Sequence, residues 1–406
     1  MNRRILAAVA SLGIAACNGP DSGVRWLGPV TQVAAPAGAG SRYPHLASAA
    51  DGRVVMSWLE PVNEGAFALR YSGWRDDSWN PAKTAASGRD WFVNWADFPS
   101  VVPFAENALA AHWLEQRPGS VYSYDVRVSI SGDDGRTWTA PTSPHDDGTP
   151  SEHGFVSLYE SGGTLQAVWL DGRHTSAEHD HGADSGGAMT LRTAAIGLDG
   201  RRIGPDVEVD PRVCDCCQTD VALTDEGAAV VYRDRSEREV RDIAVVRRTP
   251  DGWSAPVRVH EDGWIIDACP VNGPAIAARG RTVAVAWFTA PDRPRVRLAF
   301  STDSGRGFSA PIEVADGKVA GRVDVVLLAD GRAVVSWIEE RAGAAEIRAQ
   351  PFTTDGAAAA PATIARTNVA RSSGFPQMVL AGDALLFAWT QAGQAPRVLT
   401  AFAALP

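Results

Sequence analysis

The sequence predicts an all-β protein that folds as one seven-bladed β-propeller. A short apolar strand ending in an aromatic residue occurs seven times, and successive aromatic residues are 50 to 63 positions apart. The seven aromatic residues are Trp58, Trp113, Trp169, Tyr232, Trp287, Trp337 and Trp389. A period of about 50 residues built from short strands is typical of propellers with four strands in each blade. Helical spacing of apolar residues is almost absent, which also favours strands.

Each copy is flanked by the other strands that a four-stranded blade needs. Another apolar strand and a polar turn precede it, as in residues 45–52 and 275–280. A further strand follows it, as in residues 126–129 and 296–300, and a glycine turn then leads to a fourth strand. An acidic residue follows the aromatic residue by two positions in four blades, which indicates a role in the repeat itself. These residues are Glu60, Glu115, Asp171 and Glu339.

The two ends of the chain predict how the ring closes. Residues 397–402 form a third strand with no fourth strand after it, and residues 25–33 look like a fourth strand with no blade before it. Pairing the two would complete the seventh blade and leave no sheet edge unpaired. We therefore expect residues 24–406 to form a single domain.

The N-terminus predicts secretion and lipid anchoring. Two arginines are followed by an apolar run over residues 5–16, which is too short to span a bilayer and ends in small residues. Its end, Ile-Ala-Ala-Cys at residues 14–17, resembles the bacterial lipobox. The resemblance implies that residues 1–16 are removed and that Cys17 is acylated, which would anchor the protein to a membrane.

Residues 17–23 would then be a polar tether. Asn18, in place of the aspartate that favours inner-membrane retention, predicts an outer-membrane position facing the periplasm. No later segment reaches the ~20 apolar residues that a membrane-spanning helix needs. The formal net charge is −10 and no stripe of basic residues is present, which argues against nucleic acid as a partner. We expect a monomer that binds a small ligand or a metal ion.

Two of the glycine turns carry a more specific pattern. Residues 131–138 and 301–308 both match Ser-x-Asp-x-Gly-x-x-aromatic, which resembles the Asp-box of sialidase-like (BNR-repeat) propellers. In such a turn the aspartate accepts backbone hydrogen bonds and glycine supplies the positive φ. The resemblance implies a sialidase-like propeller throughout the mature chain, with these turns on the face opposite the active site.

The catalytic motifs of sialidases are not recognisable in this chain. Sialidases have six blades and an early Arg-Ile-Pro segment that begins an arginine triad, whereas the equivalent residues 41–45 here read Ser-Arg-Tyr-Pro-His. No nucleophilic tyrosine with a glutamate partner can be assigned. The chain looks like bacterial lipoproteins of the sialidase-like type, and its fold alone does not define a function.

Four of the five cysteines lie at the predicted entrances of two adjacent blades. Cys214, Cys216 and Cys217 precede the first strand of blade four, and Cys269 precedes that of blade five. These loops should share one face with the loops that join second to third strands, where propellers bind ligands. Three interpretations remain open: two disulfides, a copper(I) or zinc site, or one disulfide with a redox-active pair.

Histidines gather on the neighbouring blade three. His174, His179 and His181 lie in the loop after its aromatic strand, and His153 precedes its first strand. Because blades three and four adjoin, we expect these imidazoles to approach the cysteines, and imidazole with thiolate suits copper or zinc. The alternative is a solvated loop without a functional metal. His153 and Asn272, beside Cys269, are also candidates for binding a small ligand.

The corresponding loop of blade four is rich in charges. Arg233 and Arg241 could bind a carboxylate or sulfate, and Asp234 or Asp242 could act as an acid or base. The alternative is an ion-pair network that satisfies itself.

The leading hypothesis is a lipid-anchored, periplasm-facing protein whose Cys/His-lined site binds a thiophilic metal. An exo-acting glycoside hydrolase of the sialidase type, and an interaction scaffold whose cysteines form structural disulfides, are the alternatives.

Overall fold

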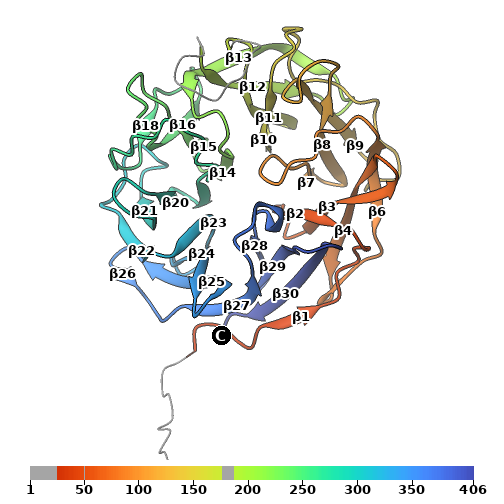
Figure 1. The fold of residues 1–406 in the computed structure, drawn as a ribbon. Helices are drawn as coiled ribbons and strands as arrows, with labels where there is room; N and C mark the ends of the chain where they lie inside the picture. Colours follow the sequence, from red (N-terminus) through yellow and green to blue (C-terminus); the bar gives the residue numbers. More distant parts are fainter. Residues whose placement is uncertain (1–24, 50, 176–186) are drawn as a thin grey trace, which may run out of the picture.

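The computed structural model describes residues 25–49, 51–175 and 187–406, and it shows a ring of seven antiparallel sheets around a central axis (Figure 1). The predicted seven-bladed propeller is therefore confirmed. The predicted signal peptide, Cys17 and the tether lie outside the described residues, as do His179 and His181. Among the residues that the structure describes, no helix has the length and hydropathy needed to cross a membrane.

Each blade begins with the strand nearest the axis and ends with the strand at the rim. Blade one contains β2 (Arg42–Ser48), β3 (Val54–Asn63), β4 (Ala66–Arg75), β5 (Ser78–Trp79) and β6 (Lys83–Gly88). Blade two contains β7 (Ser100–Ala105), β8 (Ala108–Gln116) and β9 (Tyr124–Ser131), and blade three contains β10 (His153–Ser161), β11 (Thr164–Asp171), β12 (Met189–Ile196) and β13 (Arg202–Val213). Blade four contains β14 (Asp220–Thr224), β15 (Gly227–Arg233), β16 (Ile243–Thr249), β17 (Gly252–Trp253) and β18 (Val257–Arg258).

Blades five to seven follow the same order. Blade five contains β19 (Ala275–Arg279), β20 (Thr282–Thr289), β21 (Arg295–Ser301) and β22 (Ile312–Asp316). Blade six contains β23 (Val319–Leu327), β24 (Ala333–Arg341), β25 (Ala344–Thr353), β26 (Gly356–Ala357) and β27 (Ala362–Thr367). Blade seven contains β28 (Gln377–Ala381), β29 (Ala384–Gln391), β30 (Arg397–Ala404) and β1 (Thr31–Val33). A short 3-10 helix, Arg371–Ser373, precedes blade seven.

The fourth strand is the irregular one. In blades one, four and six it is divided into two short pieces that pair with the same third strand. In blade two it is reduced to a single bridge between Val128 and Thr142. Short, interrupted edge strands offer little template for pairing with another chain, which protects the outer rim of the ring.

The ring closes as the two ends of the sequence predict. Strand β1 pairs with β30 in the register Thr31↔Phe402 and completes the sheet of blade seven (Figure 1). The paired stretch is shorter than the predicted strand, because Trp26 and Leu27 leave the sheet and pack into the apolar cluster of blades six and seven. The indole Nε1 of Trp26 donates to the Ala360 carbonyl oxygen at 2.9 Å, which ties the entry segment to blade six.

The repeated aromatic residues form the core between the blades. Trp58, Trp169 and Trp287 are fully buried, and each such side chain removes a large apolar surface from water. In three blades the acidic residue two positions later accepts the indole N–H; these pairs are Trp58–Glu60, Trp169–Asp171 and Trp337–Glu339. The recurrent acids therefore serve the repeat, because they satisfy a buried donor.

The Asp-box turns have the predicted hydrogen bonds. Asp133 Oδ1 accepts from the backbone N–H groups of Arg136 and Thr137 at 3.0 and 2.9 Å, and these contacts lower the pKa of Asp133 to about 2. Gly135 has a φ of 76°, which an L side chain rarely adopts. The turn follows β9, so it lies on the face opposite the loops that enter the first strands.

Candidate functional site

The loops that enter the first strands and those that leave the second strands meet on one face of the ring, here called the funnel face. His153 at the start of β10 pairs with Asp171 at the end of β11, and Val213 bridges to Asp234 after β15. A central cavity of about 650 Å³ is lined by the first strands of all seven blades. Chemistry-bearing residues of different blades are thus brought together around this face.

Three cysteines gather in the segment between β13 and β14. The Sγ atoms of Cys214, Cys216 and Cys217 all lie within 4.8 Å of one another, and the Cys214–Cys217 Sγ separation is 3.2 Å. The backbone N–H of Cys214 donates to the Arg233 carbonyl oxygen at 2.9 Å, which fixes the start of the segment against blade four. Cys214 and Cys217 are buried, whereas Cys216 is partly exposed.

The fourth thiol comes from the loop before blade five. Cys269 is partly exposed, and its thiol is one of the groups that raise the pKa of Cys216. The structure thus brings the four predicted cysteines together as free thiols, and we call Cys214, Cys216, Cys217 and Cys269 the thiol cluster.

The thiol cluster has an uneven charge distribution. Burial alone would raise the pKa of Cys214, but hydrogen bonds from Cys216 and Cys217 and the charges of Arg241 and Arg233 bring it well below its usual value. Burial raises the pKa of Cys216 and Cys217, and their hydrogen bonds to Cys214 raise it further. Among these three thiols, Cys214 is therefore the one whose surroundings favour the thiolate.

Arginines of the blade-four loop surround this charge. The Arg241 Nη1 donates to Cys214 Sγ at 3.3 Å, and its Nη2 donates to Glu239 at 2.7 Å. Arg235 forms ion pairs with Asp215 at 2.9 Å and with Glu239 at 3.0 Å. The guanidinium groups are held in place by carboxylates, so Arg241 is a fixed positive charge beside the sulfur.

Arg233 and Asp242, two other charged candidates of this loop, form hydrogen bonds with backbone groups. Arg233 is fully buried, donates to the carbonyl oxygens of Asn272, Arg241 and Phe288 at 2.6–2.8 Å, and stacks on Trp264 at 5.0 Å. Asp242 accepts from the N–H groups of Gly263 and Trp264.

Two further candidates are engaged in the same way. Asp234 accepts from the N–H of Arg235 at 2.7 Å, and Asn272 Oδ1 accepts from the N–H of Arg322 at 2.7 Å. These contacts match the ion-pair and hydrogen-bond network that the sequence offered as the alternative to a binding loop.

The two described histidines of this prediction, His153 and His174, do not join the cysteines. His174 is exposed, with Glu208 at 3.8 Å, while His153 is buried and turns toward blade two. Among the described residues, no group of three or more ligand atoms combines a histidine with a thiol. The expected mixed imidazole–thiolate site is therefore absent from the described part of the chain, because the carboxylates beside blade two hold the His153 ring.

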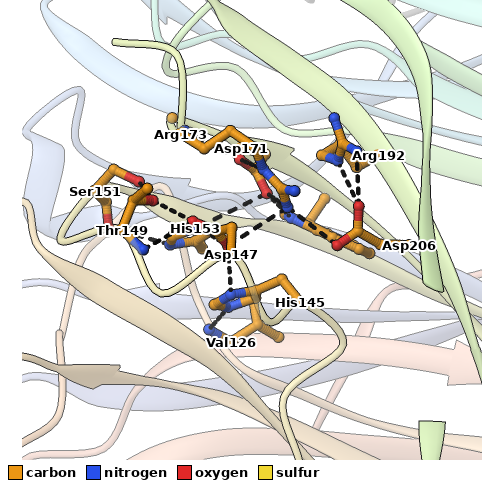
Figure 2. Close-up of polar contacts among 12 residues, drawn as sticks. Val126, His145, Asp147, Thr149, Ser151, His153, Asp171, Arg173, Arg192 and Asp206 are labelled. Atoms are coloured by element: carbon orange, nitrogen blue, oxygen red, sulfur yellow. Dashed lines mark hydrogen bonds and ion pairs between the residues drawn. The ribbon is translucent and has the colours of Figure 1, made fainter. Parts of the chain in front are cut away.

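His153 belongs to a second group, here called the histidine–aspartate cluster: Asp125, His145, Asp147, His153 and Asp171. The rings of His145 and His153 stack with centroids 3.8 Å apart, and Asp147 Oδ1 lies 3.3 Å from His145 Nδ1 and 3.2 Å from His153 Nε2 (Figure 2). His145 and Asp147 were not predicted, because the connection between blades two and three carries no sequence pattern that marks it.

Arginines and histidine rings contact the carboxylates of the histidine–aspartate cluster. Burial lowers the pKa of His145, whereas the hydrogen bond to Asp147 and the charge of Asp171 overcome burial and raise the pKa of His153. Arg173 Nη2 lies 2.7 Å from Asp171 and 3.2 Å from Asp206, and Arg192 also pairs with Asp206 (Figure 2). The Arg173 guanidinium thus pairs with Asp171 and Asp206, and the His153 ring contacts Asp147.

A buried tyrosine with carboxyl partners was also missed by the sequence reasoning. The hydroxyl of Tyr124 lies 2.6 Å from Glu152 and 3.0 Å from Asp97, and burial raises the pKa of these carboxyl groups to about 8 and about 7. Tyr124 is fully buried and its pKa is raised well above 10 by burial. A neutral hydroxyl with no access to solvent is not placed to attack a substrate.

The comparisons with known proteins agree with the fold. No family model matches the chain, and no curated protein matches it. A protein of unknown function from Dyadobacter fermentans is 14% identical, covers 94% of this chain and 100% of its own, and gives a TM-score of 0.53. The endosialidase of phage phi92 is 10% identical over 93% of this chain and 69% of its own, with a TM-score of 0.51.

The fold is that of a sialidase-like β-propeller. The predicted resemblance is therefore confirmed for the architecture, with seven blades and without recognisable sialidase catalytic motifs. Identities of this size establish the fold alone, because one propeller scaffold hosts many functions.

Proposed function

We propose that this protein binds a thiophilic metal ion, copper(I) or zinc, through the thiol cluster of a membrane-anchored propeller that faces the periplasm. The observation that carries the proposal is the convergence of four free thiols from two separate loops, with three Sγ atoms within 4.8 Å. Thiolates are the ligands that copper(I) prefers, and they also bind zinc.

The spacing of the sulfur atoms fits a metal centre. Zinc–sulfur bonds of about 2.3 Å in a tetrahedral site place the sulfur atoms roughly 3.8 Å apart. The Cys214–Cys217 separation of 3.2 Å and the 4.8 Å limit for the group lie on either side of that value. Small shifts of the partly exposed Cys216 and Cys269 would complete the ligand set.

The charges around the thiol cluster support the same proposal. A four-thiolate site carries more negative charge than one metal ion neutralises. Arg241, 3.3 Å from Cys214 Sγ, and the nearby Arg233 offset part of that excess. The carboxylates that hold Arg235 and Arg241 act as outer partners that keep the first ligand in place, as is common around metal sites.

Metal analysis of the full-length reduced protein tests the proposal. Protein solubilised in detergent and reduced under anaerobic conditions should take up copper(I) or zinc in a fixed ratio, measured against a colorimetric chelator. His174→Ala, which changes an exposed histidine away from the thiols, is the matched control and should bind as the parent does. Two disulfides in the freshly isolated protein, with no stoichiometric metal after reduction, would reject metal binding.

Membrane anchoring is tested separately. Acylation of Cys17 should place the protein in the membrane fraction and allow incorporation of a labelled fatty acid. Cys17→Ser should abolish both. Recovery of the parent protein in the soluble fraction would reject membrane anchoring, and it would not affect the proposal of metal binding.

A glycoside hydrolase activity remains the second candidate, and the likeness of the fold to a phage endosialidase is the observation that favours it. Against it, the guanidinium of Arg233 and the carboxylate of Asp242 are already used by backbone partners. Hydrolysis of any substrate in a panel of fluorogenic glycosides would support this candidate, and no hydrolysis of any of them would reject it.

A further inference from the structure

We infer that the thiol cluster is also a site of oxidative modification, in which its sulfur atoms pair as Cys214–Cys217 and Cys216–Cys269. We further infer that this oxidation and metal binding exclude each other. The second statement rests on the proposed metal function, whereas the pairing rests on the contacts of the thiols alone.

The contacts select one pairing of the four thiols. Cys214 and Cys217 have Sγ atoms 3.2 Å apart, so a bond of about 2.05 Å requires an approach of little more than 1 Å. Cys216 and Cys269 are the two partly exposed thiols, on the adjacent entrances of blades four and five. If Cys214 bonds to Cys217, with which it is already in contact, Cys216 and Cys269 are the thiols that remain.

The two pairs differ in access to solvent. Cys216 and Cys269 are partly exposed, whereas Cys214 and Cys217 have relative exposures of 0% and 1%. A dissolved oxidant therefore meets the Cys216–Cys269 pair first. That bond joins the entrance of blade four to the entrance of blade five, while the Cys214–Cys217 bond closes a short loop within one segment.

The chemistry needs an oxidant, and a small organic disulfide is sufficient. One thiolate attacks the oxidant's sulfur–sulfur bond, which releases one thiol and leaves a mixed disulfide. The neighbouring protein thiolate then displaces the second oxidant thiol. For each pair, two protein thiols lose two electrons and two protons, and one oxidant disulfide becomes two thiols, so complete oxidation consumes two equivalents.

Oxidation removes the metal ligands. The thiolate is the form of cysteine that binds a metal, and a sulfur atom in a disulfide carries no such charge. Both pairs together use all the sulfur atoms of the thiol cluster, so no thiolate remains. A bound metal, in turn, holds each sulfur in a coordinate bond and shields it from the oxidant.

The pairing is tested on the metal-free, reduced, full-length protein in detergent. After equilibration with oxidised glutathione, the number of alkylatable thiols at these positions should fall from four to zero. Proteolysis without reductant, followed by mass spectrometry, should find Cys216 linked to Cys269 and Cys214 linked to Cys217. A link between Cys216 and Cys214 or Cys217, or a link between two chains, would overturn the pairing.

Two reciprocal variants sharpen the test. In Cys269→Ser the oxidised protein should retain one alkylatable thiol, at Cys216, and in Cys216→Ser it should retain one, at Cys269. Both variants should still form the Cys214–Cys217 bond. If either variant fails to fold, the mapping of the parent protein decides the pairing by itself.

The exclusion is tested with zinc as the probe. Zinc-loaded protein should keep its thiols in a glutathione buffer that oxidises the metal-free protein, and oxidised protein should bind no zinc until it is reduced. Zinc bound in full ratio by the oxidised protein would overturn the exclusion. If the reduced protein binds neither zinc nor copper(I), the proposed function fails, and the disulfide map still confirms or refutes the pairing.

Discussion

The thiol cluster and the histidine–aspartate cluster occupy comparable places in neighbouring blades. Both lie on the funnel face where a blade begins, and both hold three potential ligand atoms within 4.8 Å. They differ in what already satisfies those atoms. Arg173 pairs with Asp171 and the His153 ring contacts Asp147, whereas in the described part of the chain Arg241 is the one guanidinium that donates a hydrogen bond to a sulfur of the thiol cluster.

This difference is the basis on which we propose the thiol cluster, and not the histidine–aspartate cluster, as the metal site. A buried charge is stable only when it is paired and hydrogen-bonded, and Arg173 and His153 pair with carboxylates of the histidine–aspartate cluster. That cluster still leaves Asp125 Oδ1 and His145 Nδ1 buried without a hydrogen bond, so hydrogen bonding alone does not set it apart. Thiolates are the ligands that thiophilic metals prefer, so the type of donor, and not the spacing of the ligand atoms, favours the thiol cluster.

The largest expected effect is the loss of metal binding when a thiol is removed. Loss of an outer partner of a metal ligand costs 10–100-fold in affinity, so Cys216→Ser, which removes a proposed ligand, should weaken metal binding by about 100-fold or more. Chelator competition with copper(I) and with zinc measures the change. Unchanged affinity in a folded Cys216→Ser protein would mean that the two clusters do not differ in the proposed way.

Removing a charge from the histidine–aspartate cluster should lower the free energy of unfolding and leave the metal affinity of the thiol cluster unchanged. Asp171 is fully buried and accepts from Trp169 and Arg173, so Asp171→Asn leaves buried cations without their counter-charge. The expected loss is about 3 kcal/mol of unfolding free energy, measured by urea unfolding. Asp330→Asn, at the exposed Asp330–Arg332 pair, is the matched control and should cost about 1 kcal/mol or less. Lower metal affinity in Asp171→Asn would contradict the separation of the two clusters.

Arg241 should have an intermediate effect on metal binding. Arg241→Gln removes the fixed positive charge that donates to Cys214 Sγ at 3.3 Å. As an outer partner of the ligand set it should change metal affinity by about 10-fold, measured with the same chelator. Arg136→Gln changes an exposed arginine of an Asp-box turn and should leave metal affinity at the parent value. An equal decrease in both variants would point to a general effect of net charge.

The smallest expected effect is a dependence of stability on pH. Carboxylates raise the pKa of His153 in the folded state, so its contribution is full below the unfolded value near 6.5 and is lost as pH rises through the folded value. Burial raises the pKa of Glu152 to about 8, so the folded state retains that proton and loses stability between about pH 4 and pH 8. Both groups predict a lower melting temperature at pH 8 than at pH 6.

Glu152→Gln separates the two contributions. The variant keeps a polar partner for the Tyr124 hydroxyl but cannot ionise, so the fall in melting temperature between pH 6 and pH 8 should become smaller. Scanning calorimetry at four pH values measures it. An unchanged slope would mean that Glu152 does not contribute, and it would leave the pH dependence to His153 and to the buried carboxyl groups of Asp97 and Asp324.

The fold could be predicted from the sequence because the patterns that indicate it are local and repeated. The spacing of Trp58, Trp113 and the later aromatic residues reports a unit of about 50 residues, and the Asp-box at residues 131–138 marks the turn between two strands. Closure was predictable because residues 397–402 form a third strand with no fourth strand after it, and residues 25–33 include a strand with no blade before it. Each of these features depends on backbone pairing over short distances in sequence or on the ends of the chain.

The candidate site could be predicted from the sequence only in part. The entrances of adjacent blades predict that Cys269 lies near the Cys214–Cys217 segment, but the direction of a side chain within a loop depends on its packing. His153 turns toward Asp147, and His145 enters from a connection that no pattern marks. Arg233 and Asp242 read as binding residues in sequence, yet the structure uses them to hold loop backbone.

The sequence by itself determined the number of blades, their order and the pair of loops that carry the cysteines, because strand periodicity and turn chemistry are encoded residue by residue. Only the tertiary structure decided which thiols touch and which charges are already neutralised. Those properties depend on side chains from several blades meeting in a space where water is excluded, and no short stretch of sequence contains that information.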